Sequence, residues 1–305
     1  MSGLLDGCVV IVTGAGRGLG RAHALELASH GATVVVNDFG VDVAGTTHEG
    51  TDVAKEVVDE VVASGGLAIA DPGSVTDWEA MRHLVNRTVE AFGKLDAVVN
   101  NAGIVRDRMI TNLAEEDFDA VMATHVKGTF ALTHHACVHW RAVAKAGGEV
   151  SGRIVNTTSG AGLAGNIGQS PYGTAKAAIA ALTIITAMEM ERYGVTANAI
   201  SPFAQTRMTA NLDAMQPDDE HAVWDARDPA NASPVVAWLA SIESGWLTGS
   251  VLRIIGNTLQ RVQPWQIDVD TEYTARSGER LAADEVGRAL RRMYGTMPTG
   301  TMTVS

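Results

Sequence analysis

A glycine-rich turn between an apolar run and a helical pattern limits the possible architectures more than any other feature. The run Cys8 to Thr13 is short and rich in β-branched residues, as expected of a buried strand. Glycine then occupies every second position, at Gly14, Gly16, Gly18 and Gly20. An amphipathic stretch from about Arg17 to His30 has helical spacing. A strand, a glycine turn and a helix in this order begin a β-α-β unit and favour a parallel sheet.

Short apolar runs continue to alternate with helix-length segments. The further strands that we expect are Ala32 to Asn37, Leu67 to Ala70, Leu95 to Val99, Arg153 to Thr157, Val195 to Ile200 and Ser250 to Ile254. This alternation predicts an α/β fold, a doubly wound parallel sheet of the Rossmann-like type with helices on both faces. We expect a single domain over residues 1–256. A C-terminal extension, residues 257–305 with a helix at about Ala282 to Met293, is expected to pack on this domain or on a neighbouring subunit.

Composition excludes several functional classes. The chain has 305 residues, of which 46% are hydrophobic, enough for a sizeable core. Its net charge of -12 disfavours broad binding to nucleic acid or to an anionic membrane. We expect neither an export signal nor a membrane-spanning segment. The two cysteines, Cys8 and Cys137, provide no disulfide framework or metal motif, which fits a cytoplasmic protein without a metal.

The glycine turn and Asp38 together predict a dinucleotide site. Glycines let the backbone approach a pyrophosphate, which then rests on the N-terminal end of the following helix. Asp38 ends the second expected strand, where its carboxylate can accept hydrogen bonds from the adenosine ribose and would repel a 2′-phosphate. NAD is therefore expected in preference to NADP. Arg17 leaves two interpretations open, contact with a 2′-phosphate or a role at the loop and pyrophosphate.

A serine, a tyrosine and a lysine form the expected catalytic group. Tyr172 and Lys176 are four residues apart and share one face of a predicted helix. Ser159 follows the strand that ends at Thr157, so all three lie near the carboxyl ends of strands. Tyr172 would exchange a proton with a substrate oxygen, Lys176 would lower its pKa, and Ser159 would orient that oxygen. The domain over residues 1–256 is therefore expected to bind NAD and to be catalytic.

These motifs resemble the short-chain dehydrogenase/reductase family from about Leu5 to Gly256. Two further marks are Asn100-Asn101-Ala102-Gly103 and Asn198-Ala199-Ile200-Ser201-Pro202. The resemblance implies that Ser159, Tyr172 and Lys176 are catalytic and that the dinucleotide is lined by Gly14, Arg17, Gly18, Leu19, Gly20, Asp38, Ser74, Val75, Asn101, Ala102, Gly103, Tyr172, Lys176, Pro202, Phe203 and Thr206. His125 stands where the family has asparagine, which implies either a proton relay or a packed, capping histidine.

A closer resemblance is to one subgroup, the (3R)-hydroxyacyl-CoA dehydrogenase units of peroxisomal multifunctional enzymes of type 2. It rests on four segments, Val35 to Gly40, Gly103 to Arg108, Gly165 to Gln169 and Thr206 to Thr209. It implies a lipid-like substrate, a coenzyme A thioester, and a homodimer or homotetramer built on helices around Phe130 to Val143 and Ala177 to Met190. Two departures, Phe203 after Pro202 and Ile254-Ile255-Gly256-Asn257 in place of Asp-Gly-Gly, leave the substrate pocket and subunit packing open.

Other candidates have two interpretations each. His134, His135 and His139 suit a metal or subunit packing. Arg106, Arg108 and Arg207 suit the phosphates of coenzyme A or ion pairs, and Trp265 suits a substrate cover or aromatic packing. The acidic segment Asn211 to Asp228 is a flap or an ordinary loop. Alternatives to the hydroxyacyl-CoA dehydrogenase are a hydroxysteroid dehydrogenase, a 3-oxoacyl-carrier-protein reductase or a catalytically silent NAD(H) sensor.

Overall fold

All of the expected strands belong to one sheet in the computed structural model. The structure describes residues 3–48, 50, 52–204, 224–263, 270, 272–275, 280–281 and 283–294. The strand order is β3-β2-β1-β4-β5-β6-β7-β8. The strands are β1 (Val9–Thr13), β2 (Thr33–Asn37), β3 (Leu67–Asp71), β4 (Ala97–Asn100), β5 (Arg153–Thr157), β6 (Thr196–Phe203), β7 (Val251–Ile255) and β8 (Thr258–Val262). Every pairing is parallel except that of β7 with β8. The expected doubly wound α/β fold is confirmed.

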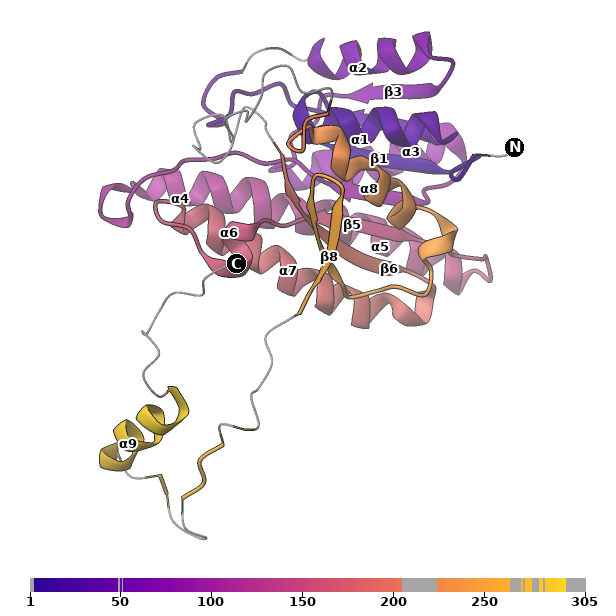
Figure 1. Cartoon of the computed structure of the whole chain (residues 1–305). Coiled ribbons are helices and arrows are strands. Elements are labelled where there is room, and N and C mark those ends of the chain that lie inside the picture. The colour runs from indigo at the N-terminus through magenta and orange to yellow at the C-terminus, as the bar shows by residue number, and fades with distance from the viewer. Residues whose placement is uncertain are drawn as a thin grey trace. The chain divides into compact units, whose positions relative to one another are not determined.

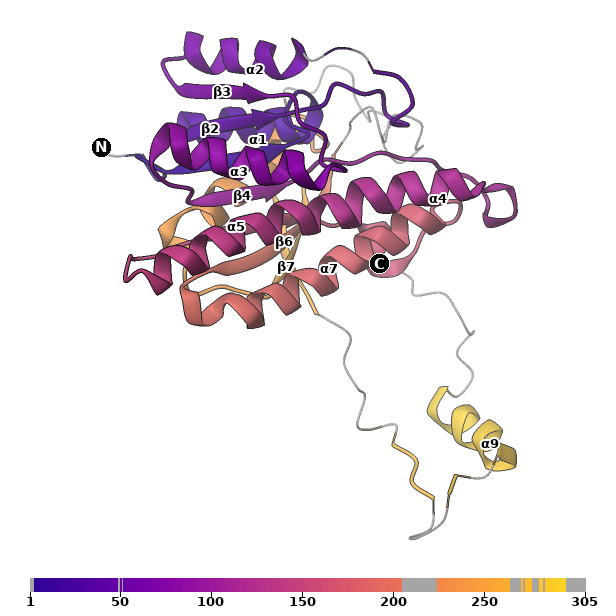
Figure 2. The same cartoon turned by 180° about the vertical axis from the view of Figure 1, so that it is seen from behind.

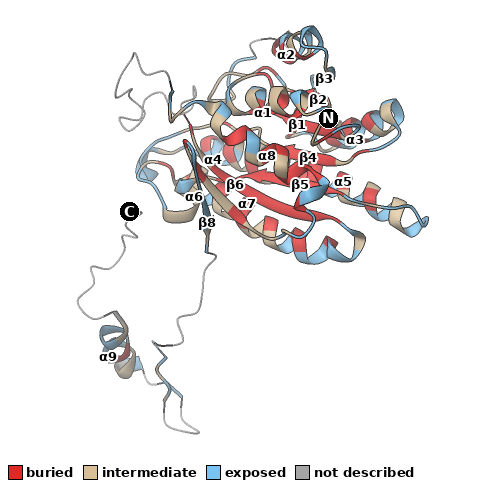
Figure 3. Ribbon diagram, turned by 45° about the vertical axis from the view of Figure 1, so that its right-hand side comes forward, coloured by how far each residue is buried: buried red, intermediate tan, exposed pale blue. Residues whose placement is uncertain are grey.

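Helices cover both faces of the sheet, as Figures 1 and 2 show from opposite sides. One face carries α1 (Gly18–Ser29), α2 (Asp52–Ala63) and α8 (Ser233–Ala240); the other carries α3 (Trp78–Phe92), α5 (Gly128–Lys145) and α7 (Ser170–Met190). Shorter helices are η1 (Ile110–Asn112), α4 (Glu115–Met122), the π-helical turn η2 (Ala123–Lys127), α6 (Gly160–Ala164), η3 (Glu191–Tyr193), η5 (Pro229–Ala232) and η6 (Ile242–Ser244). This layered arrangement buries the central strands on both sides (Figure 3).

The core divides between the two faces with the two-residue period of a strand. Val10 and Val12 of β1 join the cluster under α1 and α8, whereas Ile11 joins the cluster under α3 and α5. All five residues of β1 are buried. A strand buried on both faces reads as a continuous apolar run, which is why the sequence showed no alternation there.

The order of strands reverses direction between β1 and β4, and this reversal positions the site. The chain proceeds outward from β1 to β2 and β3, then returns to the other side of β1 at β4. The connections that leave β1 and β4 therefore separate at their carboxyl ends, where open α/β sheets bind ligands.

Strand β8 extends the sheet beyond the point where we expected its regular pattern to end. Ile255 pairs with Thr258, so Gly256 and Asn257 form the connecting turn. Gly256 has a φ of +54°, a conformation that glycine adopts without a steric penalty. The departure from the family pattern at Gly256-Asn257 is thus the turn of an antiparallel hairpin.

The chain divides into two compact units, Met1–Val262 and Gln263–Ser305. The first contains the sheet and its helices, and the second contains α9 (Ala283–Tyr294), close to the expected helix. Within the described residues, the segment Ser170–Tyr193 is long and apolar enough to cross a membrane by length and composition alone. Because α7 packs against β5 and β6, we interpret this segment as a core helix.

Candidate active site

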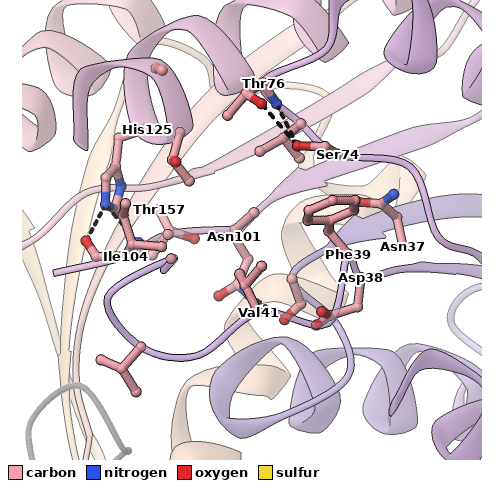
Figure 4. A pocket seen from close by; sticks show the side chains of 18 of the residues that line it. Asn37, Asp38, Phe39, Val41, Ser74, Thr76, Asn101, Ile104, His125 and Thr157 are labelled. Atoms are coloured by element: carbon pink, nitrogen blue, oxygen red, sulfur yellow. Dashed lines mark hydrogen bonds between the residues drawn. The ribbon is translucent and has the colours of Figure 1, made fainter. Parts of the chain in front are cut away.

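A cavity of about 460 Å³ lies at the switch point, a volume typical of small-molecule sites. Figure 4 shows its walls, which come from the strand ends and from the loops that follow them. Thirteen of the residues expected at the site line it: Gly14, Arg17, Gly18, Leu19, Asp38, Ser74, Val75, Asn101, Ala102, Gly103, His125, Tyr172 and Lys176. Gly20, Ser159, Pro202 and Phe203 lie outside this lining, and Thr206 lies outside the described residues.

The glycine-rich turn needs glycine for two reasons. Gly14 and Gly18 have φ values of +61° and +54°, which other residues adopt only with strain. Gly20 lies so close to the carbonyl oxygen of Gly14 that a Cβ atom would overlap it. Gly20, which we expected to line the dinucleotide, therefore permits close packing of α1 on the turn. Helix α1 begins at Gly18, so its free N–H groups are available for a pyrophosphate.

Thr13 and Asn101 join this turn to the end of β4. The Thr13 hydroxyl accepts hydrogen bonds from the backbone N–H groups of Asn101 and Ala102, both at 3.1 Å. The Asn101 side chain donates to the carbonyl oxygens of Thr13 and Gly14 at 3.0 and 3.1 Å. Asn101 thus shapes the cavity by holding two of its walls together. Thr13 takes part in the same link, and the sequence motifs did not predict this role.

Asp38 lies at the end of β2 with its carboxylate fixed by the backbone. One oxygen accepts from Gly16 N–H and the other from Gly40 N–H, each at 2.8 Å. Each carboxylate oxygen can accept a second hydrogen bond, so the expected contact with ribose hydroxyls remains available. The residues present at the turn and at Asp38 therefore fit a dinucleotide.

Ser159, Tyr172 and Lys176 converge where β5 meets α6 and α7. Ser159 follows β5 and caps the N-terminus of α6 by accepting from Ala161 N–H at 3.3 Å. Tyr172 lies in the first turn of α7, near enough to the Ser159 side chain for the serine to lower the pKa of the phenol. Lys176 lies one turn later, with its ammonium nitrogen 5.6 Å from the centroid of the Tyr172 ring. The structure thus brings together all three residues expected to be catalytic.

The electrostatics of this group differ from our expectation. Burial raises the pKa of Tyr172, the hydrogen bond from Ser159 lowers it, and the charge of Asp107 raises it. Burial also lowers the pKa of Lys176 to about 7. The expected lowering of the tyrosine pKa by Lys176 is not found in the protein alone, because desolvation disfavours both the phenolate and the ammonium.

His125 lies in the π-helical turn η2 and is fully buried. Its Nε2 atom is 3.1 Å from the backbone nitrogen of Ile104 and 2.8 Å from the carbonyl oxygen of the same residue. Burial and the charge of Lys176 lower the pKa of His125 to about 3, so the ring is neutral at physiological pH. Its Nδ1 atom has no hydrogen-bond partner among the residues that the structure describes. His125 therefore has the contacts of a capping histidine and also forms part of the cavity wall.

Most other candidates have structural partners. Arg106 and Arg108 form ion pairs with Asp117, which favours the ion-pair interpretation over phosphate binding for the protein alone. His134 and His135 contact the Trp78 ring, and the described part of the chain holds no group of three metal-binding side chains. Arg207, Trp265 and most of the segment Asn211 to Asp228 lie outside the described residues.

The fold and the site together define a class of protein. A doubly wound sheet with a glycine-rich turn at its switch point, and a tyrosine and lysine in the same cavity, is typical of dinucleotide-dependent oxidoreductases. The chain belongs to the short-chain dehydrogenase family, since the family model described as short chain dehydrogenase matches residues 8–217. It is therefore an oxidoreductase that acts on CH–OH groups, and dehydrogenases of this family generally use NAD or NADP.

Individual relatives agree with this assignment. The chain is 44% identical over 262 residues to hydroxyacyl-CoA dehydrogenase ChsB1 of Mycobacterium tuberculosis, a match that covers 85% of this chain and 81% of that protein. It is 41% identical over 234 residues to peroxisomal multifunctional enzyme type 2 of Mus musculus, covering 77% of this chain and 30% of that enzyme. The crystal structure of a short chain dehydrogenase from Mycobacterium avium matches with a TM-score of 0.85 at 48% identity, over 98% of both chains.

Proposed function

We propose that the protein is an NAD-dependent dehydrogenase that interconverts a (3R)-hydroxyacyl-CoA and a 3-ketoacyl-CoA. The observation that carries the proposal is one cavity lined both by Asp38 and by Tyr172 and Lys176. Asp38 supports NAD, because its carboxylate would repel the 2′-phosphate of NADP. The names of the two relatives above support a hydroxyacyl-CoA substrate. When bound, NAD would accept hydride from the alcohol carbon or return it to the ketone.

The chain's own residues would handle the substrate oxygen and its proton. Tyr172 donates the proton to the ketone oxygen in reduction and removes it from the alcohol in oxidation. Its raised pKa keeps the phenol protonated, which suits the donating direction. Ser159, which lies beside Tyr172, orients the same oxygen. Lys176 donates to the carbonyl oxygen of Thr157 at 2.7 Å and, in its protonated form, retains two N–H donors for ribose hydroxyls.

The direct test is reduction of NAD and of NADP by the purified protein, followed by absorbance with (3R)- and (3S)-hydroxyacyl-CoA and with hydroxysteroids. NAD-linked activity on the (3R)-thioester supports the proposal. Activity on steroids alone would favour a hydroxysteroid dehydrogenase, and dependence on NADP would favour a 3-oxoacyl-carrier-protein reductase. Binding of NADH with no turnover of any alcohol would instead favour a silent sensor.

We also propose that the protein is a homodimer or homotetramer built on α5 and α7. These neighbouring helices expose large apolar side chains, among them Phe130 and Val138 on α5 and Ile185 and Met188 on α7. Exposed apolar side chains that gather on adjacent helices support a subunit contact. Sedimentation of the wild type and of Ile185→Glu tests this, since a charge at such a contact should shift the protein toward monomers, and an unchanged distribution would contradict it.

A further inference from the structure

The segment Val41–His48 is a hairpin that forms part of the cavity wall beside Asp38. Val41 and His48 form an antiparallel bridge, and the Asp42 N–H donates to the Thr47 carbonyl oxygen at 2.9 Å. The Asp42 carboxylate accepts from the N–H and the hydroxyl of Thr46, both at 2.7 Å. These internal hydrogen bonds hold the hairpin as a unit whose position depends on what it docks against.

The hairpin docks against the segment Ile104–Arg106, which follows β4. Val105 N–H donates to the Val43 carbonyl oxygen at 3.0 Å. Gly45 packs so closely on Ile104 that a Cβ atom would lie 3.1 Å from two of its side-chain carbons. The side chains of Val41 and Ile104 are both drawn among the cavity walls in Figure 4. The hairpin therefore borders the cavity between Asp38 and the residues next to the catalytic group.

Arg106 joins the hairpin to helix α4. Its Nε atom donates to the Ala44 carbonyl oxygen at 2.9 Å, and its Nη1 atom donates to the Asp117 carboxylate at 3.2 Å. The two side chains are only 17% and 10% exposed, so this ion pair is less screened by water than a surface pair. Asp117 is fixed in turn, because its carboxylate also accepts from Ala114 N–H at 3.3 Å.

We propose that Arg106 is a positioning residue that holds the Val41–His48 hairpin against the cavity and thereby sets the affinity for the dinucleotide. This inference rests on the proposed function, because it assumes that the cavity beside Asp38 binds NAD. Arg106 itself does not line the cavity, so it acts through the hairpin that does. This role replaces the earlier interpretation of Arg106 as a ligand for coenzyme A phosphates.

Arg108 provides a matched control. It also pairs with Asp117, at 3.7 Å, but its side chain is 59% exposed and none of its described contacts reaches the hairpin. Arg106→Met and Arg108→Met remove the same charge, so their comparison separates positioning from the general attraction of an anionic cofactor. Gly45→Ala displaces the hairpin without a change of charge, because Gly45 has a φ of +68° and a close neighbour in Ile104. Gly45→Ala also tests the position of the hairpin if Arg106→Met does not fold.

The experiment is titration of each variant with NADH by fluorescence, with kcat, the KM for NAD and the thermal midpoint measured alongside. We expect Arg106→Met to raise the Kd for NADH by about tenfold, the loss expected for one charge-assisted hydrogen bond, with partial rescue in Arg106→Lys. Arg108→Met should change it by no more than about twofold, because exposed ion pairs contribute little. At saturating NAD, kcat of the Arg106 variant should stay close to that of the wild type.

Equal effects in the two arginine variants, or a wild-type Kd in Arg106→Met, would overturn the inference while the proposed function stands. So would a loss of kcat and thermal midpoint with no selective change in NADH affinity. Absence of NADH binding in the wild type would instead overturn the proposed function, and the inference with it. Weaker binding in both Arg106→Met and Gly45→Ala, with Arg108→Met unaffected, supports the inference.

Discussion

Lys176 approaches Tyr172 from one helical turn away, with its ammonium nitrogen 5.6 Å from the ring centroid and fixed by the carbonyl oxygen of Thr157 at 2.7 Å. The four-residue spacing along α7 therefore brings the two side chains together, and the hydrogen bond to the end of β5 fixes the position of Lys176. Lys176 is buried and Tyr172 is partly buried, and this burial raises the pKa of the phenol and lowers the pKa of the ammonium, which favours the neutral form of both. A bound cofactor or substrate would enter a site whose proton donor is already protonated.

Replacement of Tyr172 by phenylalanine should remove the proton donor and leave the cavity intact. We expect turnover to fall by about 100-fold to 10,000-fold, the range typical for loss of a general acid or base. The affinity for NADH should stay close to that of the wild type, because the ring still packs against the small apolar cluster that includes Ile104. Steady-state kinetics and NADH titration check this together. Tyr193→Phe is the matched control, since Tyr193 lies in η3 with its hydroxyl bonded to Arg192; comparable activity in the two variants would contradict the role of Tyr172.

Asp38→Asn should weaken the preference for NAD over NADP. The amide keeps the shape and one acceptor oxygen for Gly16 or Gly40, but it no longer repels a 2′-phosphate. We expect the ratio of kcat/KM for NAD to that for NADP to fall by at least about tenfold, which corresponds to about 1.4 kcal/mol of discrimination. Parallel kinetics with the two cofactors measure the ratio. Asp77→Asn, at the N-cap of α3, is the control, and an unchanged ratio in Asp38→Asn would assign the discrimination to another residue such as Arg17.

Acidification should destabilise the protein through two buried histidines. His23 and His125 are fully buried, and burial lowers the pKa of each from 6.5 to about 3. Below pH 6.5 the unfolded chain binds protons at these positions and the folded protein does not, so stability falls as the pH decreases from 6.5 toward 3. The free energy of unfolding should drop by about 1.4 kcal/mol per histidine for each pH unit in this window.

Urea unfolding at several pH values between 5 and 8 measures this effect. In His23→Gln, which can still bond to Ser233, the slope below pH 6.5 should lose the contribution of one histidine. His83→Gln, at an exposed position on α3, should retain the wild-type slope. The same slope in His23→Gln and in the wild type would show that His23 does not carry the pH dependence.

Local sequence patterns were sufficient to predict the strands, the glycine-rich turn and the residues of the catalytic group. Each of these depends on residues close in sequence, such as Tyr172 and Lys176 on one helix face, or on the shared carboxyl edge of parallel strands. The parallel direction of the strands also follows from the connections, because parallel strands are joined by helical crossovers, whereas the order of the strands was not predicted. These features therefore leave a signature in any sequence that adopts them.

The remaining features depend on contacts between distant residues. Arg106 bonds to Ala44 across 62 positions, and Thr13 bonds to Asn101 across 88. Neither pair produces a periodic pattern or a motif, so the docked hairpin and the polar link beneath the glycine turn were not predicted. The prediction that Lys176 lowers the pKa of Tyr172 was wrong for a related reason. This pKa depends on how deeply the folded protein buries Tyr172 and Lys176, and sequence spacing does not specify burial.

Arg153 illustrates a distant contact with a consequence for stability. It begins β5, at the end of the sheet opposite the cavity, and only 4% of the residue is exposed. Its guanidinium donates to the carbonyl oxygens of Ser241 and Gly152 at 3.0 and 2.9 Å and to the Ser151 hydroxyl at 2.8 Å. Since Ser241 is the C-cap of α8, this one side chain ties a helix on one face of the sheet to β5.

Arg153→Met should therefore lower stability without an effect on the chemistry. It fills much of the same space but removes the hydrogen bonds of a buried guanidinium, so we expect a loss of about 2–4 kcal/mol in the free energy of unfolding. Urea unfolding measures the loss, and Arg141→Met, at an exposed position on α5, should change stability by less than about 0.5 kcal/mol. Because Arg153 is remote from Tyr172, kcat of the folded variant should match the wild type. A loss of activity at full stability would mean that this end of the sheet is coupled to the cavity.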